Sequence, residues 1–175
     1  MSVSVDVRDL LRAPGTSRPV RLSAALPDVG TEVARIPEDR PVEADLLMES
    51  VVEGILVGGP LSGSMTLTCA RCLKPFEAPF DLRVEEMFAV GAGPQDDEYP
   101  VGDGFIDLEP MFRDAVMLAM PFAPLCRAEC LGLCDRCGAD RNLNECTCPP
   151  EADAGWAPLS GLALDLRSGP PPARG

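Results

Sequence analysis

The sequence predicts an α+β protein: an antiparallel β meander forming a partly closed sheet, with one core helix and a cysteine-rich zinc-binding segment. Three observations predict this class. Four runs rich in β-forming residues lie between residues 42 and 88, with turn residues between them. One apolar stripe at helical spacing follows, near residues 107–119. Six of the eight cysteines then crowd into residues 126–148.

The chain divides into three parts by composition. With 175 residues, 46% of them hydrophobic, it can bury one core and at most a second small unit. Residues 1–125 are expected to form the antiparallel β domain with its core helix. Residues 126–148 are expected to form the zinc-binding segment. Residues 149–175 form a tail rich in Pro and Gly that contains one apolar docking segment, 156–166.

The first forty residues carry weaker signals. Val3, Val5 and Val7 alternate with polar residues, which predicts a short strand over about 2–8. Pro14-Gly15 then breaks the chain. Residues 19–41 hold apolar side chains without a sustained period, so they are read as a strand or an irregular wrap.

The β meander is the clearest pattern before the cysteines. Its four predicted strands cover about 42–48, 50–57, 63–69 and 76–88. Gly58-Gly59-Pro60 is interpreted as a tight connection between the second and third strands. Cys69-x-x-Cys72 falls at the tip that joins the third strand to the fourth. A hairpin tip suits a metal site, because the turn directs two sulfurs and nearby N–H groups toward one point.

The stretch after the fourth strand predicts a loop and then a helix. Residues 91–104 are rich in Gly and acidic residues and have little to bury, so a mobile surface loop is expected. Asp107 is the predicted helix N-cap, and the helix is expected to end near Met120-Pro121. One face of this helix is predicted to be buried, and it consists of Leu108, Met111, Phe112, Ala115, Leu118 and Ala119.

The tail contains one apolar island. Its members are Trp156, Leu159, Leu162, Leu164 and Leu166. Such a segment is expected to dock on its own domain or on a partner. Docking on its own domain is favoured, because an exposed Trp beside four leucines would promote aggregation.

Composition excludes several classes of function. The net charge of −13 repels nucleic acid on average, so RNA contact would need a local basic patch. The absence of histidine excludes a Cys-His nucleophile pair and a His-liganded metalloenzyme centre, so neither an enzyme nor a small-molecule substrate is expected. Neither a secretion signal at the start nor a membrane-length apolar run is found, which predicts a cytoplasmic protein without a membrane partner.

In a reducing compartment, cysteines at these spacings are metal ligands rather than disulfides. Eight thiols and no histidine fit two four-sulfur zinc sites. The favoured grouping keeps the local set together, because short loops cost least chain entropy. Its sites are Cys134, Cys137, Cys146 and Cys148 for one ion and Cys69, Cys72, Cys126 and Cys130 for the other.

Two other arrangements of the cysteines stay open. One pairs the two C-x-x-C steps, Cys69/Cys72 with Cys134/Cys137, as in zinc ribbons. Another places Cys126, Cys130 and Cys134 on one face of a helix, although Gly132 argues for a turn. Sulfur ligands also suit an iron–sulfur cluster, and a thiol redox role is a further alternative.

Five basic side chains lie within the cysteine segments: Arg71, Lys74, Arg127, Arg136 and Arg141. They can offset the negative charge of a thiolate centre and donate hydrogen bonds to its sulfurs. They are also the candidates for any contact with an RNA partner.

The chain resembles the YceD-like proteins of bacteria and plastids, named for large ribosomal RNA accumulation. The resemblance rests on CARCLKPF at 69–76, on MPFAPLC at 120–126 and on CLGLCDRCGADRNLN at 130–144. It implies a non-enzymatic ribosome biogenesis factor that supports accumulation or processing of large-subunit (23S) ribosomal RNA. Its implied partners are the pre-ribosomal large subunit, through ribosomal protein, ribosomal RNA or both. The rival is a zinc-stabilised adaptor unrelated to ribosomes.

Overall fold

The structure is a computed structural model that describes residues 3–93 and 96–148. Its elements, in chain order, are β1 (Ser4–Asp6), α1 (Arg8–Leu11), β2 (Ser17–Ala24), β3 (Ala34–Arg35), β4 (Val42–Ser50), β5 (Gly54–Thr68), β6 (Pro75–Val90), β7 (Tyr99–Val101), β8 (Phe105–Asp107) and α2 (Glu109–Ala119). The protein is therefore of mixed α+β class and consists mostly of strands. The predicted docking segment, 156–166, lies outside the described residues.

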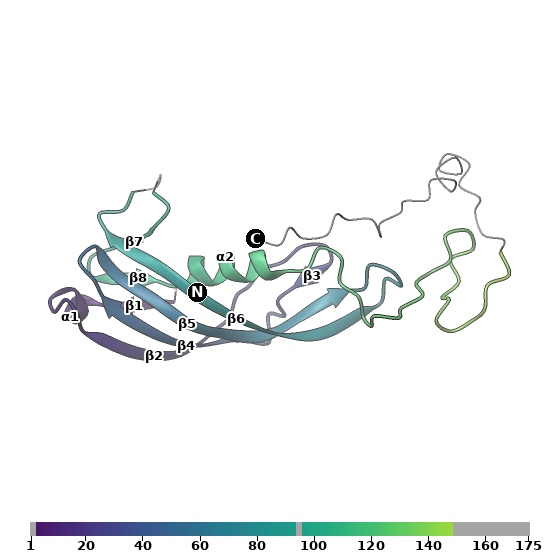
Figure 1. The fold of residues 1–175 in the computed structure, drawn as a ribbon, viewed down its shortest axis with the longest axis horizontal. Helices are drawn as coiled ribbons and strands as arrows, with labels where there is room; N and C mark the ends of the chain where they lie inside the picture. Colours follow the sequence, from purple (N-terminus) through teal and green to yellow (C-terminus); the bar gives the residue numbers. More distant parts are fainter. Residues whose placement is uncertain (1–2, 94–95, 149–175) are drawn as a thin grey trace, which may run out of the picture.

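A six-stranded sheet dominates the fold (Figure 1). Its order is β2-β4-β5-β6-β7, and β3 pairs with β5 beside this path. The pairs from β2 to β6 are antiparallel, while β7 is parallel to β6. Within the described residues β2 and β7 do not pair with each other, so the sheet is open and the expectation of a partly closed sheet was wrong. A second, two-stranded sheet joins β1 to β8.

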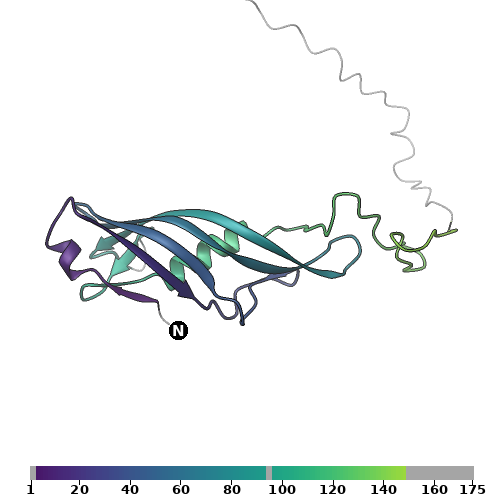
Figure 2. The same ribbon diagram turned by 90° about the horizontal axis from the view of Figure 1, so that it is seen from below.

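One face of the large sheet carries the core. Along β4, buried residues alternate strictly with exposed ones, as the period-2 pattern requires. Helix α2 lies along the covered face (Figures 1 and 2), and its buried side chains are Met111, Phe112 and Val116. They join sheet residues such as Leu46 and Phe88 in one hydrophobic cluster.

Neither helix within the described residues has the length and apolar character that a membrane span requires.

Strand β5 corrects the predicted meander. The predicted strands 50–57 and 63–69 form one strand, Gly54–Thr68, and Gly58-Gly59-Pro60 lies inside it rather than in a turn. A Cβ at Gly59 would lie 2.3 Å from the Asp45 carbonyl oxygen, so this glycine permits close approach of β4. Pro60 also lies inside β5, although proline has no backbone N–H to donate to a neighbouring strand. The real turn precedes the strand, where the Val51 N–H donates to the Gly54 carbonyl oxygen at 2.9 Å.

Helix α2 starts and packs slightly differently from the prediction. Its N-cap is Leu108 rather than Asp107, although the Asp107 carboxylate accepts the Glu109 N–H at 3.1 Å. Leu118 and Ala119, predicted to be buried, are exposed. Each residue turns a helix by about 100°, so Leu118 points about 120° away from Phe112. Val116 occupies the buried position that was expected for them.

The prediction that residues 91–104 form only a surface loop was partly wrong, because this range contains a strand. Tyr99–Val101 forms β7, which pairs with residues 88–90 of β6. The Tyr99 ring stacks on Phe88 with 5.2 Å between the ring centroids, and its hydroxyl donates to Asp114 at 2.6 Å. Burial, together with the hydrogen bond to the Asp114 carboxylate, raises the pKa of Tyr99 above its ordinary value.

We expect substitutions on the two sides of α2 to have very different effects on the free energy of unfolding. Phe112 is fully buried, so Phe112→Ala should lower the free energy of unfolding by about 3–5 kcal/mol. Leu118 is 87% exposed, so Leu118→Ala should change it by no more than about 0.5 kcal/mol. Urea unfolding followed by circular dichroism measures both. Equal losses for the two variants would contradict the packing of α2 described above.

Candidate metal centres

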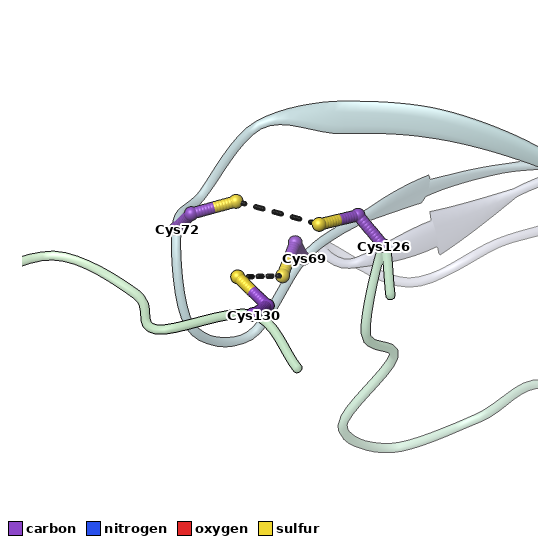
Figure 3. Close-up of side chains that lie close together, drawn as sticks. All are labelled: Cys69, Cys72, Cys126 and Cys130. Carbon is purple, nitrogen blue, oxygen red and sulfur yellow. Dashed lines mark hydrogen bonds between the residues drawn. The ribbon is translucent and has the colours of Figure 1, made fainter. Parts of the chain in front are cut away.

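The eight cysteines form two compact groups. Centre 1 consists of Cys69, Cys72, Cys126 and Cys130, and centre 2 of Cys134, Cys137, Cys146 and Cys148. Within each group all the Sγ atoms lie within 4.8 Å of one another. In Figure 3 the four side chains of centre 1 point toward one another from the hairpin tip and the segment after α2. Either group could therefore hold one metal ion.

The sulfur separations match a shared ion rather than disulfides. In centre 1, the Sγ atoms of Cys69 and Cys130 are 3.8 Å apart, as are those of Cys72 and Cys126. In centre 2, Cys146 Sγ lies 3.3 Å from Cys134 Sγ and 3.5 Å from Cys137 Sγ. Sulfurs held tetrahedrally at about 2.3 Å from zinc are about 3.8 Å apart. Disulfide sulfurs would be only about 2.05 Å apart.

The tip of the β5–β6 hairpin builds half of centre 1. The Leu73 N–H donates to the Cys69 carbonyl at 2.9 Å, and the Cys69 N–H donates to the Lys74 carbonyl at 3.0 Å. Leu73 takes the left-handed conformation, with φ of 58°, which turns the chain sharply around the two sulfurs. The other half comes from the segment after α2, which is attached by the Ala70 N–H donating to the Pro124 carbonyl at 2.8 Å.

The thiols of centre 1 are strongly coupled. Backbone N–H groups of Cys126 and Cys72 aim at the Cys69 sulfur and lower the pKa of that thiol to about 6. Burial, followed by the neighbouring Cys69 and Cys72 sulfurs, raises the pKa of Cys126 to about 12. One thiol therefore ionises readily while its neighbour resists. A bound cation would remove this conflict, because it favours the thiolate form of all four ligands.

Centre 2 is built by short local turns. The Gly138 N–H donates to the Cys134 carbonyl at 2.9 Å, and the Cys134 N–H donates to the Ala139 carbonyl at 2.8 Å. N–H groups of Cys137 and Arg136 lower the pKa of Cys134 to about 7. The neighbouring Cys146 and Cys137 sulfurs raise the pKa of Cys148 to about 12. Centre 2 thus repeats the electrostatics of centre 1.

The backbone between the two centres packs directly on the hairpin tip. The Leu133 N–H donates to the Arg71 carbonyl at 2.9 Å, and the Arg71 guanidinium donates to the Cys130 carbonyl at 2.8 Å. Gly132 has φ of 74°, and a Cβ there would lie 2.8 Å from the Arg71 carbonyl oxygen. Only glycine fits this approach without strain. In Figures 1 and 2 the cysteine-rich segment accordingly extends beyond the end of the hairpin.

Two polar residues that sequence reasoning missed, Asn142 and Asp140, support centre 1. The Asn142 amide Nδ2 donates to Cys130 Sγ at 3.5 Å and to Asp140 Oδ1 at 2.8 Å. The Asp140 carboxylate forms an ion pair with Lys74 at 2.6 Å. Lys74, followed by Asn142, lowers the pKa of Asp140 to about 2. The DRNLN sequence offered a weak signal, since Asp and Asn often accept backbone N–H groups in turns.

The five basic residues predicted to contact a partner fall into two groups, those with bonds inside the protein and those exposed at the surface. Arg71 and Lys74 bond within the centres, as described above. Arg127 donates to the Asn142 side-chain oxygen at 2.6 Å. Arg136 and Arg141 are exposed beside centre 2. The first three side chains therefore act at least in part as internal supports.

The observed groups correspond to the grouping favoured from loop length. The ribbon arrangement, Cys69/Cys72 with Cys134/Cys137, is not what the structure brings together. The helical alternative for residues 126–134 is also wrong, because these residues form turns and extended chain. The positive φ of Gly132 explains why: it directs the chain back toward Arg71.

Comparison with known proteins identifies the same family that the sequence motifs resemble. The family described as large ribosomal RNA subunit accumulation protein YceD matches residues 57–163. An uncharacterised protein of Mycobacterium tuberculosis is 35% identical over 90% of this chain and 79% of its own length. An uncharacterised protein of Mycobacterium leprae is 32% identical over 91% of this chain and 77% of its own length. A maize protein named large ribosomal RNA subunit accumulation protein YCED homolog 1, chloroplastic, is 37% identical over 37% of this chain and 22% of its own. No solved structure matches.

Fold and site together define a class: an open β-sheet protein whose β5–β6 hairpin carries one four-cysteine centre at its tip, followed by a second centre in the segment after α2. The matched stretch includes most of β5, all of β6, α2 and all eight cysteines. The chain belongs to the YceD family.

We expect Asn142 to support centre 1 specifically. Asn142→Leu removes the N–H donor to Cys130 Sγ, so metal affinity at centre 1 should fall by about 10–100-fold while centre 2 keeps its affinity. Asn144→Leu is the matched control, because that side chain is exposed and the backbone N–H of Asn144, which the substitution keeps, donates to the Asp140 carbonyl. Competition with a chromophoric chelator measures both steps. Identical titrations of the two variants would contradict the supporting role.

Proposed function

We propose that the protein is a non-enzymatic ribosome biogenesis factor that acts in the cytoplasm. In this role it supports accumulation or processing of large-subunit (23S) ribosomal RNA and assembly of the large subunit. The observation that carries the proposal is the match of the YceD family to residues 57–163, together with the name of the maize relative. The match spans all eight cysteines, so the proposed role concerns the metal-binding end of the molecule as well as the sheet.

We propose zinc as the ion in both centres. Four cysteine sulfurs at these separations suit tetrahedral zinc. Four thiolates also fill the coordination sphere and leave no position for a water or substrate, which favours a structural role over a catalytic one. The zinc ions would hold the segment after α2 against the hairpin tip. This is the physical basis for proposing a binding factor rather than an enzyme.

The surface chemistry suits a basic partner. The uncovered face of the large sheet carries exposed acidic side chains, namely Glu43, Asp45 and Glu49 on β4 and Asp81 and Glu85 on β6. Together with the net charge of −13 of the whole chain, these side chains favour basic ribosomal proteins by electrostatic attraction. Arg136 and Arg141, exposed beside centre 2, are the proposed positions for any contact with ribosomal RNA.

Depletion of the protein in a bacterium that carries this gene tests the proposal. We expect less mature 23S RNA, more of its precursors and fewer large subunits in sucrose gradients. The intact chain should restore them, whereas Cys69→Ser and Cys134→Ser, each of which removes a ligand from one centre, should not.

The control for this rescue is Val52→Ser. Val52 is 92% exposed in the β4–β5 turn, so the variant keeps both centres and should restore the RNA fully. Normal 23S RNA and normal subunit profiles after depletion would refute the proposed function. Rescue by both cysteine variants would refute the part that assigns it to the metal centres.

A further inference from the structure

An apolar groove of about 370 Å³ lies between residues 31–33 and the end of α2. Val33 lines one side, and Met117, Met120 and Phe122 line the other. Phe122 is 100% exposed and Met117 is 42% exposed. Large apolar side chains this exposed around one hollow mark a binding surface. None of the eight cysteines lines this groove, and nothing in the proposed function uses it.

We propose that residues 156–166 of the same chain occupy this groove. The segment holds Trp156 and four leucines in a tail otherwise dominated by Pro, Gly and Ala. Apolar segment and apolar groove are therefore chemically matched, and their association would bury both. Attachment to the same chain also gives the segment a high effective concentration at the groove.

The groove and the described end of the chain are both attached to the tip of the β5–β6 hairpin. The Thr68 N–H donates to the Val33 carbonyl at 2.8 Å, which sets one wall of the groove directly beside Cys69 of centre 1. Cys148, the last described residue, belongs to centre 2, and centre 2 is joined to the same tip through Leu133 and Arg71. Trp156 lies 8 positions after Cys148 and Leu166 lies 18 positions after it, so fully extended chain would span at most about 26 to 60 Å from Cys148.

Two further observations favour this occupant. The family match runs to residue 163, so it includes Trp156, Leu159 and Leu162 together with α2 and Phe122. The sequence similarity that defines the family therefore extends over most of the segment as well as over α2 and Phe122. A second copy of the chain fits the groove less well, because two molecules that each carry −13 charges repel each other.

Trp156 makes the proposal measurable, because it is the single tryptophan of the chain. We expect its fluorescence in the folded full-length protein to be shifted to the blue of the urea-unfolded chain and protected from acrylamide quenching. Phe122→Ser should abolish most of this shift and protection. Val52→Ser changes an apolar side chain in the β4–β5 turn that is also highly exposed, at 92%, and it should leave both unchanged.

A second measurement reads the groove itself. Met117 and Met120 line it, whereas Met65 is buried in the core. The double substitution Leu159→Ser/Leu162→Ser in the full chain should shift the methyl resonances of Met117 and Met120 and leave that of Met65 in place.

Three results would overturn the proposal. The first is Trp156 emission equal to that of the unfolded chain. The second is a blue shift that depends on protein concentration, which would mean docking between copies. The third is a blue shift that Phe122→Ser leaves intact, with Met117 and Met120 unmoved by the leucine substitutions. Each result leaves the ribosomal RNA experiment unaffected, because the groove and the proposed function are tested by separate variants.

Discussion

Four thiolates within 4.8 Å of one another repel unless a cation compensates their charge, and the end of this molecule depends on that compensation. Backbone N–H groups lower the pKa of Cys69 to about 6, whereas burial, followed by the neighbouring Cys69 and Cys72 sulfurs, raises that of Cys126 to about 12. A metal ion would convert the repulsion between the sulfurs into attraction by binding all of them. A metal ion bound there would couple folding of the cysteine-rich segment to metal binding, as in other small metal-stabilised units.

The sheet gives this unit a fixed base. Strands β5 and β6 pair continuously from Gly54↔Ala89 to Thr68↔Pro75, and the last pair leads directly into Cys69 and Lys74. At the other end of the hairpin the core holds the strands through residues such as Ile55 and Phe88. Near its tip the hairpin has few buried neighbours besides Phe76 and the cysteines. The cysteines of centre 1 therefore form the small core at the tip, and a metal ion bound among them would hold that core together.

Sequence reasoning was successful where the signal is local. The spacing of Cys134 to Cys148 implied the compact group that the structure contains, and the alternation in β4 was visible directly. Sequence reasoning failed where contacts between distant segments determine the local structure. Gly58-Gly59-Pro60 has the composition of a turn, yet the close approach of β4 keeps it extended. Strand β7 has three residues and exists through its pairing with β6, and Asn142 matters through a sulfur twelve residues away. None of these contacts leaves a periodic pattern in the sequence.

Zinc K-edge X-ray absorption on the purified full-length protein, with elemental analysis of the same sample, tests the central claim most directly. The account predicts about two zinc ions per chain, each surrounded by about four sulfurs at about 2.3 Å. It also predicts no visible absorption from an iron–sulfur cluster. A protein that folds with its thiols paired as disulfides, or with zinc bound mainly through oxygen and nitrogen, would contradict it.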